Sequence, residues 1–331
     1  MKPRVALIGT GGTIASLGAG PFDITDYIRH GRMLDAAGLL DFWPQVAEVA
    51  DVVPVKFSAV PSTAIGPAEW LVLHAACEAA AAADPALAGI VVAHGTASLE
   101  ETAYFLALTW KREMPIVVVG SQRPSSSLSS DAGMNLANAC RVAGDPRARG
   151  LGALVLLNDE IHAARDVTKT STSRLQTFRS ADFGCLGHAD GDVIAWYRRP
   201  LRGTGAATPF DVAGRTALPR VDIAACYAGA DGAAIEAFVA AGAAGIVTAG
   251  FAPGFVTPAM GVAMEAAVAK GVAVVCSTRA GSGRVFPSER MARAGFLPAD
   301  NLTPQKARVL LMLALTVTRE REAIAEMFAR F

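Results

Sequence analysis

The stretch Val5-Ala-Leu-Ile-Gly9-Thr10-Gly11-Gly12-Thr13-Ile14 decides the fold class, because a short apolar run leads directly into a glycine-rich turn. A run that is apolar throughout is typical of a parallel strand covered on both faces. Glycines at its end let backbone N–H groups converge on a ligand at the carboxyl edge of the sheet. The stretch therefore predicts a first parallel strand with a binding site at its end.

Apolar runs of the same kind recur along the chain, and segments with helical periodicity separate them. The alternation predicts an α/β protein with a doubly wound, mainly parallel sheet. Two helix starts carry a signature: a capping box at Ser98 and Glu101, and an N-cap followed by proline at Thr303-Pro304. The expected strands cover residues 5–9, 90–95, 116–120, 154–158, 193–197, 221–226, 246–250 and 272–277. The expected helices cover residues 67–83, 99–112, 131–143, 232–241, 258–270 and 304–318.

The apolar periodicity stops around residues 198–218, where Arg-Arg-Pro, Gly-Thr-Gly and Leu-Pro elements accumulate. This segment is the expected linker. It would join a larger N-terminal α/β catalytic domain, residues 1–197, to a smaller C-terminal α/β domain, residues 219–331. The chain has 331 residues, of which 52% are hydrophobic, and that is enough for two domains with their own cores.

Composition narrows the class of function and the compartment. The 30 Lys and Arg residues balance the 30 Asp and Glu residues, so no global field favours nucleic acid or an anionic membrane as a partner. The five cysteines are widely separated and show no zinc or redox spacing, which is typical of core thiols in a reducing compartment. Because no apolar run is long enough for a signal peptide or a membrane span, we expect a cytoplasmic protein.

The glycine-rich turn does not match a dinucleotide site. The third glycine of the G-x-G-x-x-G pattern would fall at Ile14, and the segment about 20 residues on lacks the acidic residue that binds ribose. A purely structural turn is one interpretation. The other follows from Thr13, because a hydroxyl beside unhindered amides suits a nucleophile next to an oxyanion hole.

Two further motifs carry polar side chains. In His94-Gly95-Thr96-Ala97-Ser98, Thr96 is expected at the same sheet edge as Thr13, and His94 is interpreted as a hydrogen-bonded core histidine. Glu100 and Glu101 follow in the first turn of a helix, where carboxylates favour the helix dipole. In the polar segment 158–180, Lys169 is either solvated or, if partly buried, a base with a lowered pKa.

Several motifs, in this order, resemble those of bacterial L-asparaginase/glutaminase. They are Gly-Gly-Thr-Ile-Ala at 11–15, His-Gly-Thr-x-x-Leu-Glu-Glu-Thr-Ala-Tyr-Phe-Leu at 94–106, Gly-Ser-Gln-Arg-Pro at 120–124, Ala-Arg-Asp-Val-Thr-Lys at 164–169 and Thr-Pro-Gln-Lys-Ala-Arg-Val-Leu-Leu at 303–311. The resemblance implies a two-domain asparaginase-like fold that cleaves a small-molecule amide through a threonine acyl-enzyme, without a metal or an organic cofactor. It also implies a homo-oligomer, a dimer of dimers, in which a neighbour's smaller domain completes each site.

The resemblance also implies residue roles. Thr13 corresponds to the nucleophile, Tyr27 to the tyrosine that activates it, and Thr96 with Lys169 to a second catalytic pair in which the lysine is the base. Ser62 lies eight residues before Trp70, the family spacing for the serine that binds the substrate α-carboxylate. The substrate-binding candidates are Gly12, Ser62, Thr63, Gly95 and Ala97.

One position departs from the family. The family motif is His-Gly-Thr-Asp, and its aspartate holds the substrate α-ammonium and hydrogen-bonds the catalytic lysine, whereas this chain has Ala97. A buried ammonium without its counter-charge costs several kcal/mol. We therefore expect an acid-amide that lacks the α-amino group, such as the monoamide of a dicarboxylic acid, and a Lys169 whose charged form is less favoured. The alternatives are an L-asparaginase in which another carboxylate such as Glu289 compensates, and a non-catalytic ligand-binding descendant.

Overall fold

The computed structural model describes residues 2–331, and the chain divides after Ala207 into two compact units. The N-terminal unit ends at Ala207, and the C-terminal unit spans Thr208–Phe331. The division falls within the segment 198–218, where the apolar periodicity of the sequence stops.

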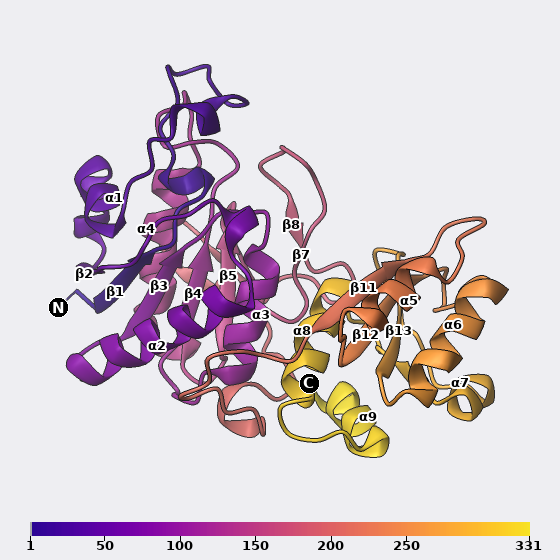
Figure 1. The fold of residues 1–331 in the computed structure, drawn as a ribbon. Coiled ribbons are helices and arrows are strands. Elements are labelled where there is room, and N and C mark those ends of the chain that lie inside the picture. Colours follow the sequence, from indigo (N-terminus) through magenta and orange to yellow (C-terminus); the bar gives the residue numbers. More distant parts are fainter. Residues whose placement is uncertain (1) are drawn as a thin grey trace. The chain divides into compact units, whose positions relative to one another are not determined.

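In the described part of the N-terminal unit, one eight-stranded sheet has the order β10-β9-β6-β5-β4-β3-β1-β2 (Figure 1). The five strands from β2 to β5 along this order are parallel, and the strands β6, β9 and β10 extend the sheet in antiparallel fashion. Their bounds are β1 Arg4–Gly9, β2 Asp51–Val55, β3 Gly89–Ala93, β4 Ile116–Val119, β5 Ala153–Leu157, β6 Glu160–Ala163, β9 Gly187–Ala189 and β10 Ile194–Trp196. A separate hairpin pairs β7 Thr168–Lys169 with β8 Phe178–Arg179.

Helices cover both faces of this sheet, which is why its central strands are apolar throughout. The helices α1 Ala36–Phe42 and α4 Ala132–Ala143 share a core with one set of alternate strand residues, which includes Val5, Val91 and Val117. The helices α2 Pro67–Ala83 and α3 Leu99–Thr109 pack against each other and lie outside that core (Figure 1). Short 3-10 helices occur at η1 Thr13–Ala15, η2 Tyr27–His30, η3 Pro44–Glu48, η4 Ser62–Ala64, η5 Pro146–Ala148 and η6 Gly205–Ala207.

The C-terminal unit contains a smaller parallel sheet of its own, with the order β11-β12-β13-β14. Its strands are β11 Val221–Ala225, β12 Gly245–Gly250, β13 Ala273–Thr278 and β14 Leu297–Pro298. Its helices are α5 Ala233–Ala240, α6 Pro258–Ala269, α7 Glu289–Ala294, α8 Pro304–Ala314 and α9 Arg321–Arg330. The expected class is thus confirmed: a larger, mainly parallel α/β sheet unit and a smaller parallel α/β unit.

The structure corrects several local expectations. The capping box at Ser98 is wrong, because the Ser98 hydroxyl donates to the carbonyl oxygen of Ser62 at 2.6 Å and does not cap α3. Thr303 does precede Pro304 at the start of α8, but its side chain makes no capping bond. The helices α3 and α8 end at Thr109 and Ala314, before the expected ends at residues 112 and 318.

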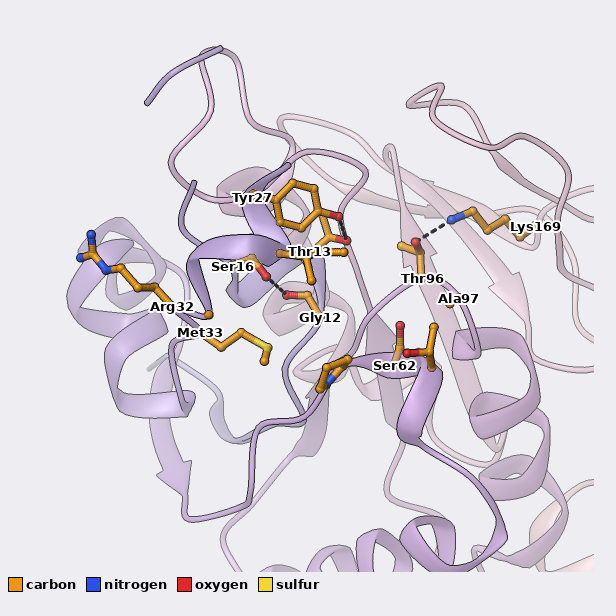
Figure 2. Close-up of a pocket in the computed structure, with 14 residues that line it drawn as sticks. Gly12, Thr13, Ser16, Tyr27, Arg32, Met33, Ser62, Thr96, Ala97 and Lys169 are labelled. Carbon is orange, nitrogen blue, oxygen red and sulfur yellow. Dashed lines mark hydrogen bonds between the residues drawn. The ribbon is translucent and has the colours of Figure 1, made fainter. Parts of the chain in front are cut away.

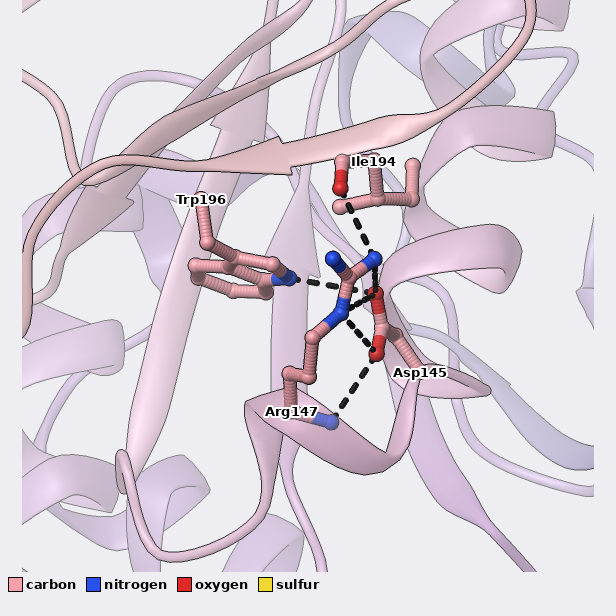
Figure 3. Close-up of polar contacts among 4 residues, drawn as sticks. All are labelled: Asp145, Arg147, Ile194 and Trp196. Carbon is pink, nitrogen blue, oxygen red and sulfur yellow. Dashed lines mark hydrogen bonds and ion pairs between the residues drawn. The ribbon is translucent and has the colours of Figure 1, made fainter.

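The edge strand β10 is held by a small polar cluster (Figure 3). Asp145 accepts hydrogen bonds from the Arg147 backbone N–H at 2.9 Å and from the indole Nε1 of Trp196 at 3.1 Å. The Arg147 guanidinium pairs with Asp145 at 2.7 Å and donates to the Ile194 carbonyl oxygen at 2.8 Å. Burial raises the pKa of Asp145, but the bonds from Arg147 and Trp196 outweigh it, so the net shift is downward.

Two properties of the described residues bear on where the protein resides: the hydropathy of its helices and the state of its cysteines. None of the helices within residues 2–331 has the length and hydropathy that a bilayer crossing requires. The five cysteines are free thiols, four of them buried and Cys185 half-buried.

Candidate active site

The strand order places a ligand site between β1 and β3. Along the parallel part of the sheet, β2 and β3 lie on opposite sides of β1, so the chain changes direction at this point. In open α/β sheets, ligands bind at the carboxyl ends of the strands at such a switch point. Gly9 pairs with Ala93 at these two ends, and the following turns carry Thr13 and Thr96.

Two glycines let the turns after β1 and β3 approach closely. A Cβ on Gly12 would lie 2.1 Å from the Gly95 Cα, and Gly12 has a φ of +82°, which side chains disfavour. A Cβ on Gly95 would lie 2.5 Å from the Ser62 hydroxyl oxygen. Three separate segments therefore meet here only because two of them contribute a glycine at the point of contact.

A cavity of about 480 Å³ lies at this meeting point (Figure 2). Eight of the nine residues proposed from the sequence line it, and Gly95 lies against Gly12 without contributing to the lining. The sequence did not indicate the other six, which include Met33 and Ser16, whose backbone N–H donates to the Thr13 carbonyl oxygen at 3.1 Å. The lining residues are Gly12, Thr13, Ser16, Tyr27, Ile28, Gly31, Arg32, Met33, Pro61, Ser62, Thr63, Thr96, Ala97 and Lys169.

The first polar pair joins Thr13 to Tyr27. The Thr13 Oγ1 and the Tyr27 hydroxyl oxygen lie 2.9 Å apart, within hydrogen-bond distance (Figure 2). Thr13 begins the helix η1, so the first backbone N–H groups there have no partner within the helix. Both side chains are half-buried. The pair therefore presents a hydroxyl, a second hydroxyl that can accept its proton, and nearby amide donors.

The second polar pair joins Lys169 to Thr96. The Lys169 ammonium nitrogen donates to Thr96 Oγ1 at 2.7 Å. The hairpin of β7 and β8 sets this position, because Lys169 pairs with the buried Phe178 in its register. The polar segment that contains Lys169 is thus an ordered hairpin at this point, and it brings a lysine to a threonine 73 residues earlier in the chain.

The pKa of Lys169 is lowered, and burial is the cause, as the sequence analysis expects for a partly buried lysine. Burial lowers it, and the charge of Glu100 partly offsets this by raising it. The absence of a carboxylate at Ala97 therefore does not leave the lysine without a neighbouring negative charge. Glu100 is buried, and its Oε2 has no hydrogen-bond partner among the described residues.

Ser62 and His94 have different surroundings. Ser62 is half-buried in the helix η4 and lines the cavity, and the Ser98 hydroxyl holds its carbonyl oxygen. His94 is fully buried, and its Nδ1 lies 2.8 Å from the Gly95 carbonyl oxygen. The His94 Nε2 lies 3.0 Å from the hydroxyl of Thr102, which also accepts from Trp70. Burial lowers the pKa of His94 to about 4, so it is a neutral structural histidine, as interpreted from the sequence.

The cavity wall carries no negative charge: none of the described residues that line it is an aspartate or a glutamate. Ala97 is exposed at the wall and presents only a methyl group. The guanidinium of Arg32 points away from Thr13, whereas Lys169 points inward (Figure 2). Glu289 begins α7 in the C-terminal unit, where it is 90% exposed and pairs with Arg293 at 2.9 Å.

No metal site accompanies this arrangement. Within residues 2–331, no three histidine, cysteine, aspartate or glutamate side chains gather closely enough to hold a metal ion. The polar side chains among the described lining residues are hydroxyls, Lys169 and Arg32.

Comparisons with known proteins cover the entire chain. The family "Asparaginase, N-terminal" matches residues 4–202, and "Glutaminase/Asparaginase C-terminal domain" matches residues 220–328. L-asparaginase 2 of Bacillus subtilis (strain 168) is 40% identical over 329 residues, which are 99% of this chain and 87% of that protein. Glutaminase-asparaginase of Pseudomonas fluorescens biotype A is 35% identical over 328 residues, 98% of this chain and 90% of that protein. The crystal structure of a probable cytoplasmic L-asparaginase from Campylobacter jejuni superposes with a TM-score of 0.94, at 36% identity, over 100% of both chains.

Proposed function

The chain belongs to the asparaginase/glutaminase family and is a hydrolase of amides, and from that premise we propose that it releases ammonia from a carboxamide through an acyl-enzyme on Thr13. The proposal draws on the two polar pairs in one cavity, because acyl transfer through a hydroxyl needs a proton acceptor for each half-reaction.

In the first half-reaction, Thr13 Oγ1 attacks the amide carbonyl carbon, and the Tyr27 hydroxyl accepts the Thr13 proton as it passes its own proton toward the amide nitrogen. The backbone N–H groups at the start of η1 stabilise the negative charge on the carbonyl oxygen. The C–N bond breaks, the amide nitrogen takes up the proton from Tyr27, and ammonia leaves. The carbonyl carbon remains bound to Thr13 as an ester.

In the second half-reaction, water attacks the ester carbon. Neutral Lys169 removes the water proton through Thr96, and the C–O bond to Thr13 breaks. The departing Thr13 oxygen takes a proton from the Tyr27 hydroxyl, which solvent reprotonates, while Lys169 gives its proton up to solvent, and the acid is released. The lowered pKa of Lys169 supports this role, because a larger fraction of the lysine is then neutral near pH 7.

The substrate class follows from the cavity wall. Since no carboxylate is among the described residues that line the cavity, an α-ammonium group would meet no counter-charge there. Ser62 supplies a hydroxyl for a substrate carboxylate. We therefore propose an acid-amide that lacks the α-amino group, with monoamides of dicarboxylic acids such as succinamate as the simplest examples.

The alternative is an L-asparaginase in which another carboxylate, such as Glu289, replaces the family aspartate that is missing at Ala97. The exposure of Glu289 favours it, because a carboxylate that is 90% exposed is available to a neighbouring copy of the chain. A non-catalytic ligand-binding descendant is disfavoured, because both hydrogen-bonded pairs are intact.

The test is ammonia release from L-asparagine, L-glutamine, D-asparagine and succinamate, with Thr13→Ala as the blank. We expect succinamate to have the highest kcat/KM and Thr13→Ala to be inactive. Efficient, low-KM turnover of L-asparagine would establish the alternative. An acyl adduct on the peptide containing Thr13, detected by mass spectrometry after acid quench, would separate an enzyme from a binding protein.

We also propose a dimer of dimers and a cytoplasmic location. Light scattering on the purified protein should give the mass of four chains. Free thiols on all five cysteines suit a reducing compartment. Cell fractionation checks the location, and recovery of the protein in the periplasmic fraction would exclude it.

A further inference from the structure

The hairpin that carries Lys169 is tied to the eight-stranded sheet through a buried histidine. His162 lies on β6, and only 1% of its side chain is exposed. Its Nδ1 lies 3.0 Å from the hydroxyl oxygen of Ser180, a buried residue that directly follows β8. The contact therefore joins a strand of the sheet to the returning strand of the hairpin.

The tie closes a segment that is fixed at both ends. At its start, β6 ends at Ala163, and the Val167 N–H donates to the Ala163 carbonyl oxygen at 3.2 Å, two residues before Lys169. At its end, Phe178 pairs with Lys169 in the hairpin, and Ser180 follows two residues later. The backbone of Lys169 is thus held by a turn on one side and by the Ser180 side chain on the other.

Glu160 gives the histidine a defined hydrogen-bonding state. Its Oε2 lies 3.2 Å from His162 Nε2. The pKa of Glu160 is lowered, chiefly by His162, so the carboxylate is charged at neutral pH. A negative charge beside Nε2 of a neutral imidazole favours a proton on that nitrogen, which leaves Nδ1 to accept from the Ser180 hydroxyl. Since His162 and Ser180 are both buried, water does not readily replace either partner when the other is removed.

The position of this hairpin matters for the proposed chemistry because of one short contact, in which the Lys169 nitrogen donates to Thr96 Oγ1 at 2.7 Å. A general base acts only within hydrogen-bond reach of the proton that it removes. Misplacement of a catalytic group by about 1 Å can lower the rate about a hundredfold. A hairpin without its tie to β6 would move Lys169 relative to Thr96. Thr13 and Tyr27 lie outside the hairpin, so their contact would not change.

We propose that the contact between His162 and Ser180 positions Lys169 for hydrolysis of the acyl-enzyme. Neither His162 nor Ser180 belongs to the described lining of the cavity, so both are positioning residues and not catalytic ones. The inference rests on the proposed function, because it needs an ester on Thr13 and Lys169 as the base that activates water. It predicts that loss of the contact slows hydrolysis of the ester and leaves formation of the ester unchanged.

The test uses Ser180→Ala and compares the two half-reactions in one measurement. The reaction is quenched with acid at a saturating concentration of the most active amide in the substrate panel, and mass spectrometry gives the ratio of acylated to free peptide containing Thr13. This ratio equals the rate constant for ester formation divided by the rate constant for ester hydrolysis. It should rise by up to about a hundredfold in Ser180→Ala. Unfolded protein adds only free peptide, so damage to the fold would lower the ratio.

Two substitutions at residue 162 separate the hydrogen bond from side-chain volume. His162→Leu keeps a side chain of comparable size but removes the bond to Ser180, so the ratio should rise as in Ser180→Ala. His162→Asn places an amide where Nδ1 lies and should keep the ratio near that of the parent protein. Ser173→Ala is the matched control, because it removes an exposed hydroxyl from the same hairpin and should leave the ratio unchanged.

Lys169→Ala sets the reference, because it removes the proposed base itself. The inference is overturned if Lys169→Ala raises the ratio but Ser180→Ala and His162→Leu do not, or if His162→Asn raises it as much as His162→Leu. If Ser180→Ala does not fold, the comparison of the two His162 variants decides alone. Failure of the proposed function has a different signature, because Lys169→Ala then gives no acylated Thr13 or leaves the ratio unchanged.

Discussion

Ala97→Asp restores a carboxylate at the one position where the chain departs from the family motif, and it is the most direct test of the charge argument. Ala97 is exposed to the cavity, so an aspartate there can reach a bound ligand without being forced into the core. A hydrogen bond between charged groups contributes about 1.5–3 kcal/mol. A difference of about 1.4 kcal/mol in binding free energy changes affinity tenfold. We therefore expect kcat/KM for L-asparagine to rise roughly 10- to 150-fold relative to kcat/KM for succinamate.

The same substitution should shift the pH profile. Residue 97 adjoins Thr96, whose hydroxyl is 2.7 Å from the Lys169 ammonium, so a carboxylate there favours the charged lysine. A base must be neutral to act. The pKa of Lys169 should therefore rise in Ala97→Asp, and the acid limb of the kcat profile should move to higher pH.

The assay is ammonia release from both substrates across a pH series, with Ala97→Asn as the matched control of equal size without charge. The result is expressed as the ratio of kcat/KM for L-asparagine to kcat/KM for succinamate, because the amount of active enzyme cancels in that ratio. The reasoning is refuted if Ala97→Asp and Ala97→Asn give the same substrate ratio, or if the unsubstituted protein already prefers L-asparagine.

Three further predictions concern single hydrogen bonds and charges. Glu100→Gln removes the charge that raises the pKa of Lys169, so that pKa falls and the acid limb of the kcat profile should move to lower pH; an unchanged limb would exclude the interaction. Tyr27→Phe should lower kcat about 10²- to 10⁴-fold with little change in KM, measured in steady state, because it removes the proton acceptor at 2.9 Å from Thr13 but keeps the ring. Trp196→Phe should lower the free energy of unfolding in urea at pH 7 by about 1 kcal/mol, because it removes a donor to Asp145.

The last of these has a defined pH dependence. The pKa of Asp145 is lowered in the folded protein, so its charged form contributes stability above the unfolded-state pKa, and this is lost as the pH falls through the folded-state pKa. The difference between Trp196→Phe and the parent protein should shrink over the same acid range. A difference that is constant down to low pH would show that lost packing, and not the bond to Asp145, causes it.

The fold was largely predictable from local sequence patterns. The elements that these patterns did not predict were missed for physical reasons. All eight expected strands are present. Seven of them pair in parallel with a neighbour, for which a continuous apolar run is typical, and the eighth, β10, is an antiparallel edge strand. The strand β2 was missed because it is an edge strand that contains Pro54 and is only half-buried. The helix α1 was missed because it has only seven residues, and two of these, Ala36 and Leu39, are buried.

The candidate site was predictable only in part. Thr13 and Thr96 could be placed at one sheet edge, since each follows a predicted parallel strand and carboxyl ends share an edge. Met33 could not, because a bridge to Ser16 leaves no periodic signal. Glu100 was assigned to the helix dipole alone, because helix position says nothing about which distant charge a side chain faces.

The sequence by itself determined the fold class, the family and the residue types available for catalysis, because hydropathy patterns and ordered motifs are local properties. The family resemblance implied the pairs Tyr27 with Thr13 and Lys169 with Thr96, and the tertiary structure decided that their polar atoms lie 2.9 Å and 2.7 Å apart. It also decided which charged side chains line the cavity: Lys169 is among the described lining residues, and no carboxylate is. The reason is that hydrogen bonds and charge interactions depend on distances of a few ångströms, and the packing of strands and loops far apart in the chain sets those distances.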